Sequence, residues 1–142
     1  MGSIEAHYGK PALTIPANAT VSEAAKVMTE RRIGALVVTD AGSPVGLVSE
    51  RDLVAKVLVP CLDACAVLVS DVMLREVVFV SPREDPARCS ELMKLGGSRT
   101  LVVRDGDHLL GVVSMRDVIR ALLDERESEV RQLTEYVTGS NA

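Results

Sequence analysis

The chain contains one short pattern twice: a glycine-led apolar stretch that ends in Ser-x-Arg-Asp. The first copy is Gly46–Asp52 and the second is Gly111–Asp117. In each copy the serine stands where a strand gives way to a helix, so its hydroxyl can cap the first free N–H groups of that helix. The aspartate three residues later falls in the first helical turn, where the helix dipole favours a negative charge. A helix N-terminus with a hydroxyl, a guanidinium and a carboxylate around it suits a phosphate and a sugar diol.

A purely structural interpretation competes with this one. In it the two serines only cap helices, the two aspartates only complement the helix dipole, and the two arginines form surface ion pairs of little consequence. The repetition separates the two interpretations only weakly, because a structural cap would be duplicated as well.

The elements that position the first copy follow from hydrophobic periodicity. We expect a strand at 12–15, a helix from 21 to 32, strands at 35–38 and 45–48 joined by a turn, and a helix from 49 to 60. Thr20 and Glu23 have the spacing of a capping box at the start of the first helix. The second helix is expected to bury one apolar face, formed by Leu53, Val54, Val57 and Leu58.

The same order restarts after a connector. We expect a single helical turn around Val69–Met73, and then a strand at 79–80, a helix from about Pro86 to Gly96, strands at 100–103 and 109–113, and a helix opened by Ser114. Leu92, Met93 and Leu95 are expected to form the apolar face of the helix that precedes Gly96-Gly97. His108 is expected in a solvated turn.

Sliding the sequence by about 65 positions aligns the two halves without a gap, which indicates an internal duplication. The expected fold is α/β: tandem β-α-β-β-α repeats, packed face to face about a pseudo-twofold axis. The predicted segments are an N-terminal segment (1–11, with a short helix around Ile4–Tyr8), a first repeat (12–60), a connector (61–77), a second repeat (78–123) and a C-terminal helical extension (124–142).

Composition excludes several classes of function. The 142 residues are 47% hydrophobic and 25% charged, which is ordinary for a folded domain, but only 2% are aromatic and the formal net charge is −4. A nucleic-acid partner is therefore not expected. The longest apolar run, 57–69, is interrupted by Pro60 and Asp63, so no membrane span is expected, and no secretory signal is visible. A cytoplasmic protein is the expectation.

Three cysteines, Cys61, Cys65 and Cys89, lack the spacing of a disulfide framework and fit a reducing compartment. Cys61 and Cys65 would face each other on a helix, but structural zinc takes four ligands and no third candidate lies near, so no metal is expected. Free cysteines are most often small buried apolar residues. With no paired acid and base, no nucleophile beside a histidine and no phosphate-binding loop, an enzyme is not expected.

The last helix is expected to run beyond the second repeat. Its apolar residues recur at a spacing of three and four through a charged stretch, which is typical of a packed helix. They are Ile119, Leu122, Leu123, Val130, Leu133 and Val137. We expect them to pack against a second copy of the chain.

Taken in order and twice, these features resemble the cystathionine-β-synthase (CBS) domain. The features that carry the resemblance are the helix that ends in Ile33–Val38, the turn at Asp40 and the Ser-x-Arg-Asp phrase. The resemblance covers about residues 12 to 123 and indicates a stand-alone CBS pair, or Bateman module. Leu133–Gly139 also resembles the tail of small bacterial members.

The resemblance implies a cleft between paired units that binds an adenine-containing ligand: AMP, ADP, ATP, NAD(H) or S-adenosylmethionine, with no catalytic cofactor. It implies that the aspartates bind ribose hydroxyls, that the serines meet ribose or phosphate, and that the arginines neutralise phosphate. The residues so implied are Asp52, Asp117, Ser49, Ser114, Arg51 and Arg116. The adenine would be flanked by Thr14, Ile15 and Ala17, with their counterparts Val80, Ser81 and Pro82, and its edge would be read by the backbone of Gly34, Ala35, Arg99 and Thr100.

Two functions follow as alternatives. The first is a regulatory homodimer that senses adenine nucleotides and passes a change of shape to an unknown protein partner. The second is a homodimeric scaffold whose ligand sites are degenerate. Because Arg99 stands where the first repeat has Gly34, the two clefts are not equivalent, and we expect the one around Asp117 to bind an anionic nucleotide better.

Overall fold

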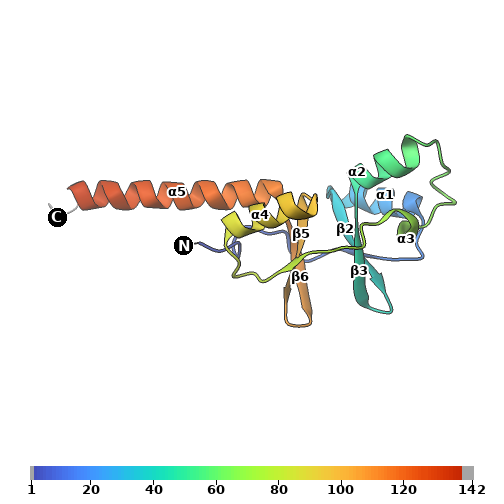
Figure 1. Cartoon of the computed structure of the whole chain (residues 1–142), viewed down its shortest axis with the longest axis horizontal. Helices are drawn as coiled ribbons and strands as arrows, with labels where there is room; N and C mark the ends of the chain where they lie inside the picture. The colour runs from blue at the N-terminus through green and yellow to red at the C-terminus, as the bar shows by residue number, and fades with distance from the viewer. Residues whose placement is uncertain (1, 139–142) are drawn as a thin grey trace. The chain divides into compact units, whose positions relative to one another are not determined.

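The structure is a computed structural model that describes residues 2–138. It divides the chain into two compact units, Pro11–Val77, which we call the first-repeat unit, and the residues up to Lys10 together with those from Val78 onward, which we call the second-repeat unit. Each unit has a three-stranded sheet (Figure 1). The mixed α/β fold predicted from the sequence, with the element order of each repeat, is confirmed.

The first-repeat unit places its sheet strands in the order β1-β2-β3. Strand β1 runs parallel to β2, and β2 runs antiparallel to β3. The elements are β1 (Thr14–Pro16), α1 (Val21–Arg31), β2 (Ala35–Asp40), β3 (Ser43–Ser49), α2 (Glu50–Leu53), the π-helix η1 (Val54–Leu58) and α3 (Val69–Val72).

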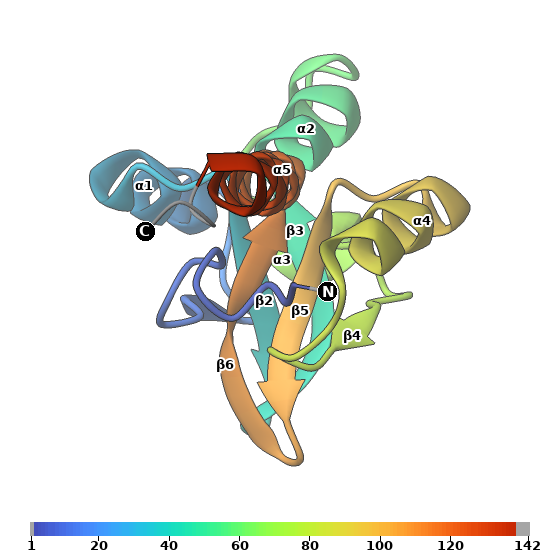
Figure 2. The ribbon, with the colours of Figure 1, turned by 90° about the vertical axis from the view of Figure 1, so that its left-hand side faces the viewer.

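The second-repeat unit has the same arrangement, with the sheet order β4-β5-β6 (Figure 2). Strand β4 is parallel to β5, and β5 is antiparallel to β6. The elements are β4 (Phe79–Val80), α4 (Pro86–Gly96), β5 (Thr100–Asp105), β6 (His108–Ser114) and α5 (Met115–Thr138).

The predicted helix signals act as expected. Thr20 and Glu23 form a reciprocal capping box on α1. Asp85 caps α4 with Pro86 in the first turn, and Gly97 ends that helix at a positive φ of 67°. The single turn predicted in the connector is α3.

Each unit has an aliphatic core between its sheet and its helices. The central strands β2 and β5 carry apolar runs that are buried throughout, as short continuous runs predict. Helices α1 and α4 bury the same three positions of the repeat, spaced by three and four residues. These are Val21, Ala24 and Met28 on α1, and Pro86, Cys89 and Met93 on α4.

Each sheet is completed by a segment that precedes the other repeat in sequence. In the first-repeat unit the connector pairs with β3, through antiparallel bonds between Leu47 and Leu74 of 2.9 and 2.8 Å. In the second-repeat unit the N-terminal segment pairs with β6, through bonds between Gly9 and Val112 of 2.9 and 3.1 Å (Figure 2). Ile4 of that segment is fully buried in the core of the second-repeat unit.

Several expectations on local structure are wrong. The N-terminal segment forms turns rather than a short helix. The helix after Ser49 widens into the π-turn η1, which leaves Val54 and Leu58 more than half exposed. Leu95 is 80% exposed because the buried face of α4 passes through Cys89 and Met93 instead.

Two further corrections concern polar and sulfur-containing residues. His108 begins β6 rather than lying in the turn, although it is exposed. Cys61 and Cys65 are exposed on a non-helical connector, so the expectation that free cysteines are buried holds only for Cys89. In the described part of the chain, no helix is both long enough and apolar enough to cross a membrane.

Candidate functional site

The two Ser-x-Arg-Asp phrases form matching corners, one in each unit. We call Ser49–Asp52 the first corner and Ser114–Asp117 the second corner. In the first corner the Ser49 N–H and hydroxyl donate to Asp52 Oδ2 over 2.9 and 3.0 Å, and the Asp52 N–H donates to Ser49 Oγ over 3.3 Å. The second corner repeats these bonds at 2.8, 3.0 and 3.2 Å. Both serines therefore cap helices, as the structural interpretation requires.

This cap leaves part of each carboxylate available. An ionised carboxylate has two oxygens with about two acceptor positions each, and the serine occupies only Oδ2. The second oxygen, Oδ1, differs between the corners. Asp52 Oδ1 lies 3.4 Å from Lys56 Nζ, whereas Asp117 Oδ1 has no hydrogen bond or ion pair with any residue among 2–138. The structural and the ligand-binding interpretations are thus compatible at the second corner.

The strand register brings the predicted edge-reading backbone to these corners. Ala35 pairs with Ser49, and the Glu50 N–H donates to the Gly34 carbonyl over 3.0 Å. In the other unit Thr100 pairs with Ser114, and the Met115 N–H donates to the Arg99 carbonyl over 3.0 Å. Each corner therefore joins the start of one strand to the start of a helix.

The predicted first-strand residues lie farther along each sheet. Thr14 and Ile15 pair with Val37 and Val38, and the Ala17 N–H donates to the Thr39 carbonyl over 2.8 Å. At about 3.3 Å per residue, Thr39 lies roughly 13 Å along β2 from the position that faces Ser49. The structure therefore places Ala17 well away from the first corner.

The second repeat has the same strand register, shifted by 65 positions, so the expected match of Val80, Ser81 and Pro82 with Thr14, Ile15 and Ala17 is wrong for Val80 and Ser81. Phe79 takes the place of Thr14, because it pairs with Val102 as Thr14 pairs with Val37. Val80 then corresponds to Ile15, and Ser81 and Pro82 follow β4. The side chains of Ile15 and Val80 are buried in the two cores, at 4% and 5% exposure, so little of either surface is open to a ligand.

The exposed cations at the corners are unpaired. Arg51, Arg99 and Arg116 are exposed, and within the described chain none of their side chains forms a hydrogen bond, ion pair or ring contact. The surface ion pairs that the structural interpretation assigns to the arginines are therefore not formed. A guanidinium without a partner at a helix start is available to an anion.

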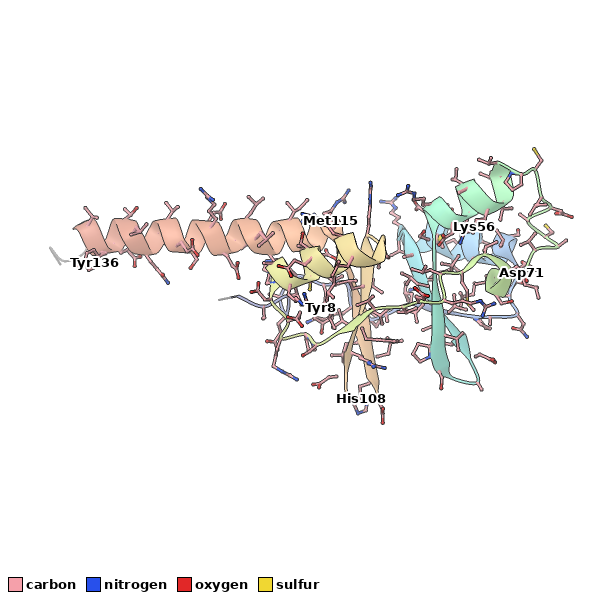
Figure 3. All side chains as sticks on the ribbon, in the orientation of Figure 1. Tyr8, Lys56, Asp71, His108, Met115 and Tyr136 are labelled. Carbon is pink, nitrogen blue, oxygen red and sulfur yellow. The ribbon has the colours of Figure 1, made fainter. Side chains whose placement is uncertain are left out.

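Sequence reasoning missed three residues around the corners. Lys56 follows Asp52 by four residues, the spacing at which helical side chains meet, so the pair could have been found. Glu50 and Met115 occupy the same place in the two phrases and differ in charge (Met115 and Lys56 are labelled in Figure 3).

A groove of about 280 Å³ lies in the first-repeat unit between α1 and the α2–η1 segment. Its lining is apolar except for Thr29 and Glu50, and it includes none of the predicted site residues. The four residues that the sequence predicts as one apolar face, Leu53, Val54, Val57 and Leu58, all line this groove, although the sequence gives no sign that a groove forms there.

The comparisons with known proteins agree with the duplicated fold. A family model described as "CBS domain" matches residues 6–59 and 69–124. A mitochondrial CBS domain-containing protein of Arabidopsis thaliana, CBSX3, is 33% identical over 125 residues, which cover 84% of this chain and 61% of that protein. The chain therefore spans less than two thirds of this relative.

Solved structures give the same result. A protein with CBS domains from Burkholderia ambifaria MC40-6 has a TM-score of 0.77 and 34% identity, covering 82% of this chain and 85% of that one. A hexameric CBS-CP12 protein from bloom-forming cyanobacteria has a TM-score of 0.79 over 100% of this chain and 89% of its own, but at 23% identity this likeness shows the fold alone. The chain belongs to the CBS-domain family and carries two CBS domains in tandem.

Proposed function

We propose that the chain is a regulatory module that binds an adenine nucleotide through the Ser-x-Arg-Asp corners. The observation that supports this most is the second corner, where a half-buried carboxylate with a free oxygen stands beside an unpaired guanidinium on a helix N-terminus. A carboxylate oxygen accepts hydrogen bonds from ribose hydroxyls, and a guanidinium binds phosphate oxygens. CBS pairs generally bind adenosine ligands, which makes AMP, ADP, ATP, NAD(H) and S-adenosylmethionine the candidates.

We propose that an anionic nucleotide prefers the second corner. Arg99 and Arg116 both stand there without a partner, whereas the first corner has Gly34 in place of Arg99 and adds the carboxylate of Glu50. A Cβ atom placed on Gly34 would lie 3.8 Å from Glu50 Cδ, so this carboxylate lies beside the position that Arg99 has in the second repeat. The charge near a bound phosphate is therefore more favourable at the second corner.

Calorimetric titration of the full chain with AMP, ATP, NADH and S-adenosylmethionine tests the proposal. We expect at least one to bind, and Asp117→Ala to abolish or strongly weaken its binding. Asp107→Ala is the matched control, because Asp107 is an exposed carboxylate of the β5–β6 turn with no hydrogen bond or ion pair to residues 2–138. The proposal fails if none of the four binds, or if Asp117→Ala and Asp107→Ala behave alike.

Arg116→Ala examines the phosphate contact separately. The Arg116 side chain is exposed and forms no hydrogen bond or ion pair with residues 2–138, so its removal should leave the fold unaffected. Loss of a charge-assisted hydrogen bond should weaken AMP by roughly tenfold. Adenosine, which lacks the phosphate, should bind the variant and the wild type equally.

The exposed stripe on α5 favours a homodimer, with or without a ligand. The C-terminal part of α5 extends away from the rest of the second-repeat unit, with Tyr136 near its end (Figure 3). Val130, Leu133 and Val137 are 56%, 64% and 70% exposed at a spacing of three and four residues. Helices with such a stripe bury it against a partner helix, and we propose that the partner is α5 of a second copy.

Light scattering at a known protein concentration tests this pairing. Leu133→Glu should convert a dimer into a monomer, while Gln132→Glu, which adds the same charge on a neighbouring exposed position, should leave the dimer intact. A dimer that binds none of the four nucleotides would favour the scaffold function. A monomeric wild type would exclude the pairing.

A further inference from the structure

We propose that Lys56 keeps the first corner closed by occupying the carboxylate oxygen that a ribose would need. This inference rests on the proposed function, since it concerns the same type of site. It adds a specificity-determining residue: the nucleotide enters the second corner, and the first corner accepts one only when Lys56 leaves.

The lysine is held by two groups. Its Nζ lies 3.4 Å from Asp52 Oδ1 and donates to the Val72 carbonyl over 2.8 Å. Because Asp52 Oδ2 already accepts from the Ser49 N–H and hydroxyl, both oxygens of this carboxylate are engaged. With about two acceptor positions on each oxygen, only about one position on Asp52 is left, whereas the two hydroxyls of a ribose diol need one each. A ribose diol that binds Asp52 with both hydroxyls must therefore displace the ammonium group.

The contact with Val72 means that Lys56 is held by more than its ion pair with Asp52. Val72 is the last residue of α3, and the carbonyls at the end of a helix have no partner within the helix. The Lys56 ammonium satisfies one of them and so joins the first corner to the connector. Releasing Lys56 costs both contacts, whereas an isolated surface pair contributes little.

The second corner has no equivalent of this lysine. Ala121 stands at the corresponding position and is buried, at 2% exposure. Asp117 Oδ1 consequently has no partner among the described residues. The two aspartates share the same cap and differ in whether the second oxygen is occupied.

The backbone around Lys56 differs between the repeats as well. Lys56 lies inside the π-turn η1, where the Val59 N–H donates to the Val54 carbonyl over 2.9 Å. The corresponding part of α5 is a regular α-helix. Single π-turns inside helices occur frequently at functional sites.

If Lys56 acts only through its positive charge, its removal changes the affinity for AMP in the opposite direction from the one that our proposal predicts. Lys56 is a cation close to a site for an anionic ligand, so removing it should weaken the binding of AMP if Lys56 acts only through its charge or binds the phosphate. If Lys56 competes with the ribose, removing it should instead tighten AMP. The sign of the change decides between the two.

The experiment measures AMP binding by calorimetry in an Asp117→Ala background, which disables the second corner. Adding Lys56→Ala, which introduces the residue found at this position of the second repeat, should increase the affinity for AMP by about tenfold. This is the effect expected when AMP no longer has to break one ion pair and one charged hydrogen bond in order to bind. Adding Asp52→Ala to that double variant should abolish the gain. Lys26→Ala in the same background is the charge-matched control, because the Lys26 side chain is exposed on α1 and forms no hydrogen bond or ion pair with residues 2–138.

A second variant, Lys56→Met, removes the charge but keeps the aliphatic part of the side chain, so it controls for destabilisation caused by lost packing. The inference is overturned if both Lys56 variants weaken AMP or leave it unchanged while the Asp117→Ala chain remains folded. It is also overturned if Asp117→Ala alone still binds AMP as tightly as the wild type through Asp52. Failure of the proposed function looks different: the wild type itself then binds no nucleotide, or the variant that combines Asp52→Ala with Asp117→Ala binds AMP as tightly as the wild type.

Discussion

The two repeats have the same elements, but each relies on a different segment to complete its sheet. The first-repeat unit uses the connector that follows it, and the second-repeat unit uses residues from the N-terminus. The correspondence is close, since Ile4 and Val69 are both fully buried and are 65 positions apart. Each repeat is therefore preceded by a segment that packs with the other repeat, and we call these two segments, residues 2–10 and the connector, the lead segments. Because residues 2–10 pack with the second repeat, that repeat depends on contacts between residues far apart in the sequence.

The largest expected effect comes from removing residues 2–10. The deletion exposes the Ile4 site, breaks the Gly9–Val112 pair, and removes the contacts of Gly2 with Glu125 and of His7 with Asp124. We expect it to destabilise the second-repeat unit by more than the ~2–5 kcal/mol of a single large-to-small core substitution. Hydrogen exchange should show faster opening of β6 than of β3. Equally faster exchange in β3 and β6 would contradict the claim that residues 2–10 support only the second-repeat unit.

Two glycines give the next effect, because each lets a lead segment cross its sheet closely. A Cβ on Gly111 would overlap the Gly9 carbonyl and the Tyr8 ring. A Cβ on Gly46 would overlap the Met73 side chain and lie 3.0 Å from the Leu74 carbonyl oxygen, a tight contact but not an overlap. Gly111→Ala should cost at least ~1–3 kcal/mol, because a backbone group cannot move aside. Gly46→Ala should cost less, because a methionine side chain is flexible. Thermal unfolding measures the difference, and the reverse order would contradict the explanation.

The capping serines should behave alike, which tests how far the two corners are equivalent. Ser49→Ala and Ser114→Ala each remove an N-cap and should each cost about 1 kcal/mol of unfolding free energy. Chemical denaturation of the two variants measures this. If the serines also contact a ligand, only Ser114→Ala should weaken AMP binding, because the first corner is closed.

The smallest effect at neutral pH concerns Cys89, which replaces Ala24 at the same buried position of the first repeat. Burial, with added repulsion from Glu84 and Asp85, raises the pKa of the Cys89 thiol from 9.0 to about 11. Because the folded pKa is the higher one, its contribution to stability is present below pH 9 and is lost as the pH rises toward 11. Cys89→Ala should reduce the fall of the thermal midpoint over this range.

Thiol labelling provides the companion measurement for Cys89. At pH 8, in the native state, a thiol reagent should modify the exposed Cys61 and Cys65 and spare Cys89. Rapid modification of all three would show that the core of the second-repeat unit opens readily.

The order of elements could be read from the sequence because local signals act within a few residues. The Thr20–Glu23 capping box, the Pro86 start and the Gly97 stop each depend on neighbouring backbone groups, and the structure confirms all three. The exposure of Leu95 and the π-turn at Val54–Leu58 could not be read in this way, because both depend on which helical face the rest of the fold covers.

For the candidate site, the sequence by itself determined that two Ser-x-Arg-Asp corners exist, since a duplicated cap needs only the hydroxyl, the carboxylate and the three-residue spacing between them. Tertiary structure alone decided that Lys56 reaches the Val72 carbonyl and that Ile4 lies in the core of the second-repeat unit. These contacts join residues 16 positions apart in the first case and opposite ends of the chain in the second, so no local pattern encodes them. They form because buried apolar surface and unpaired carbonyls must find partners wherever the folded chain places them.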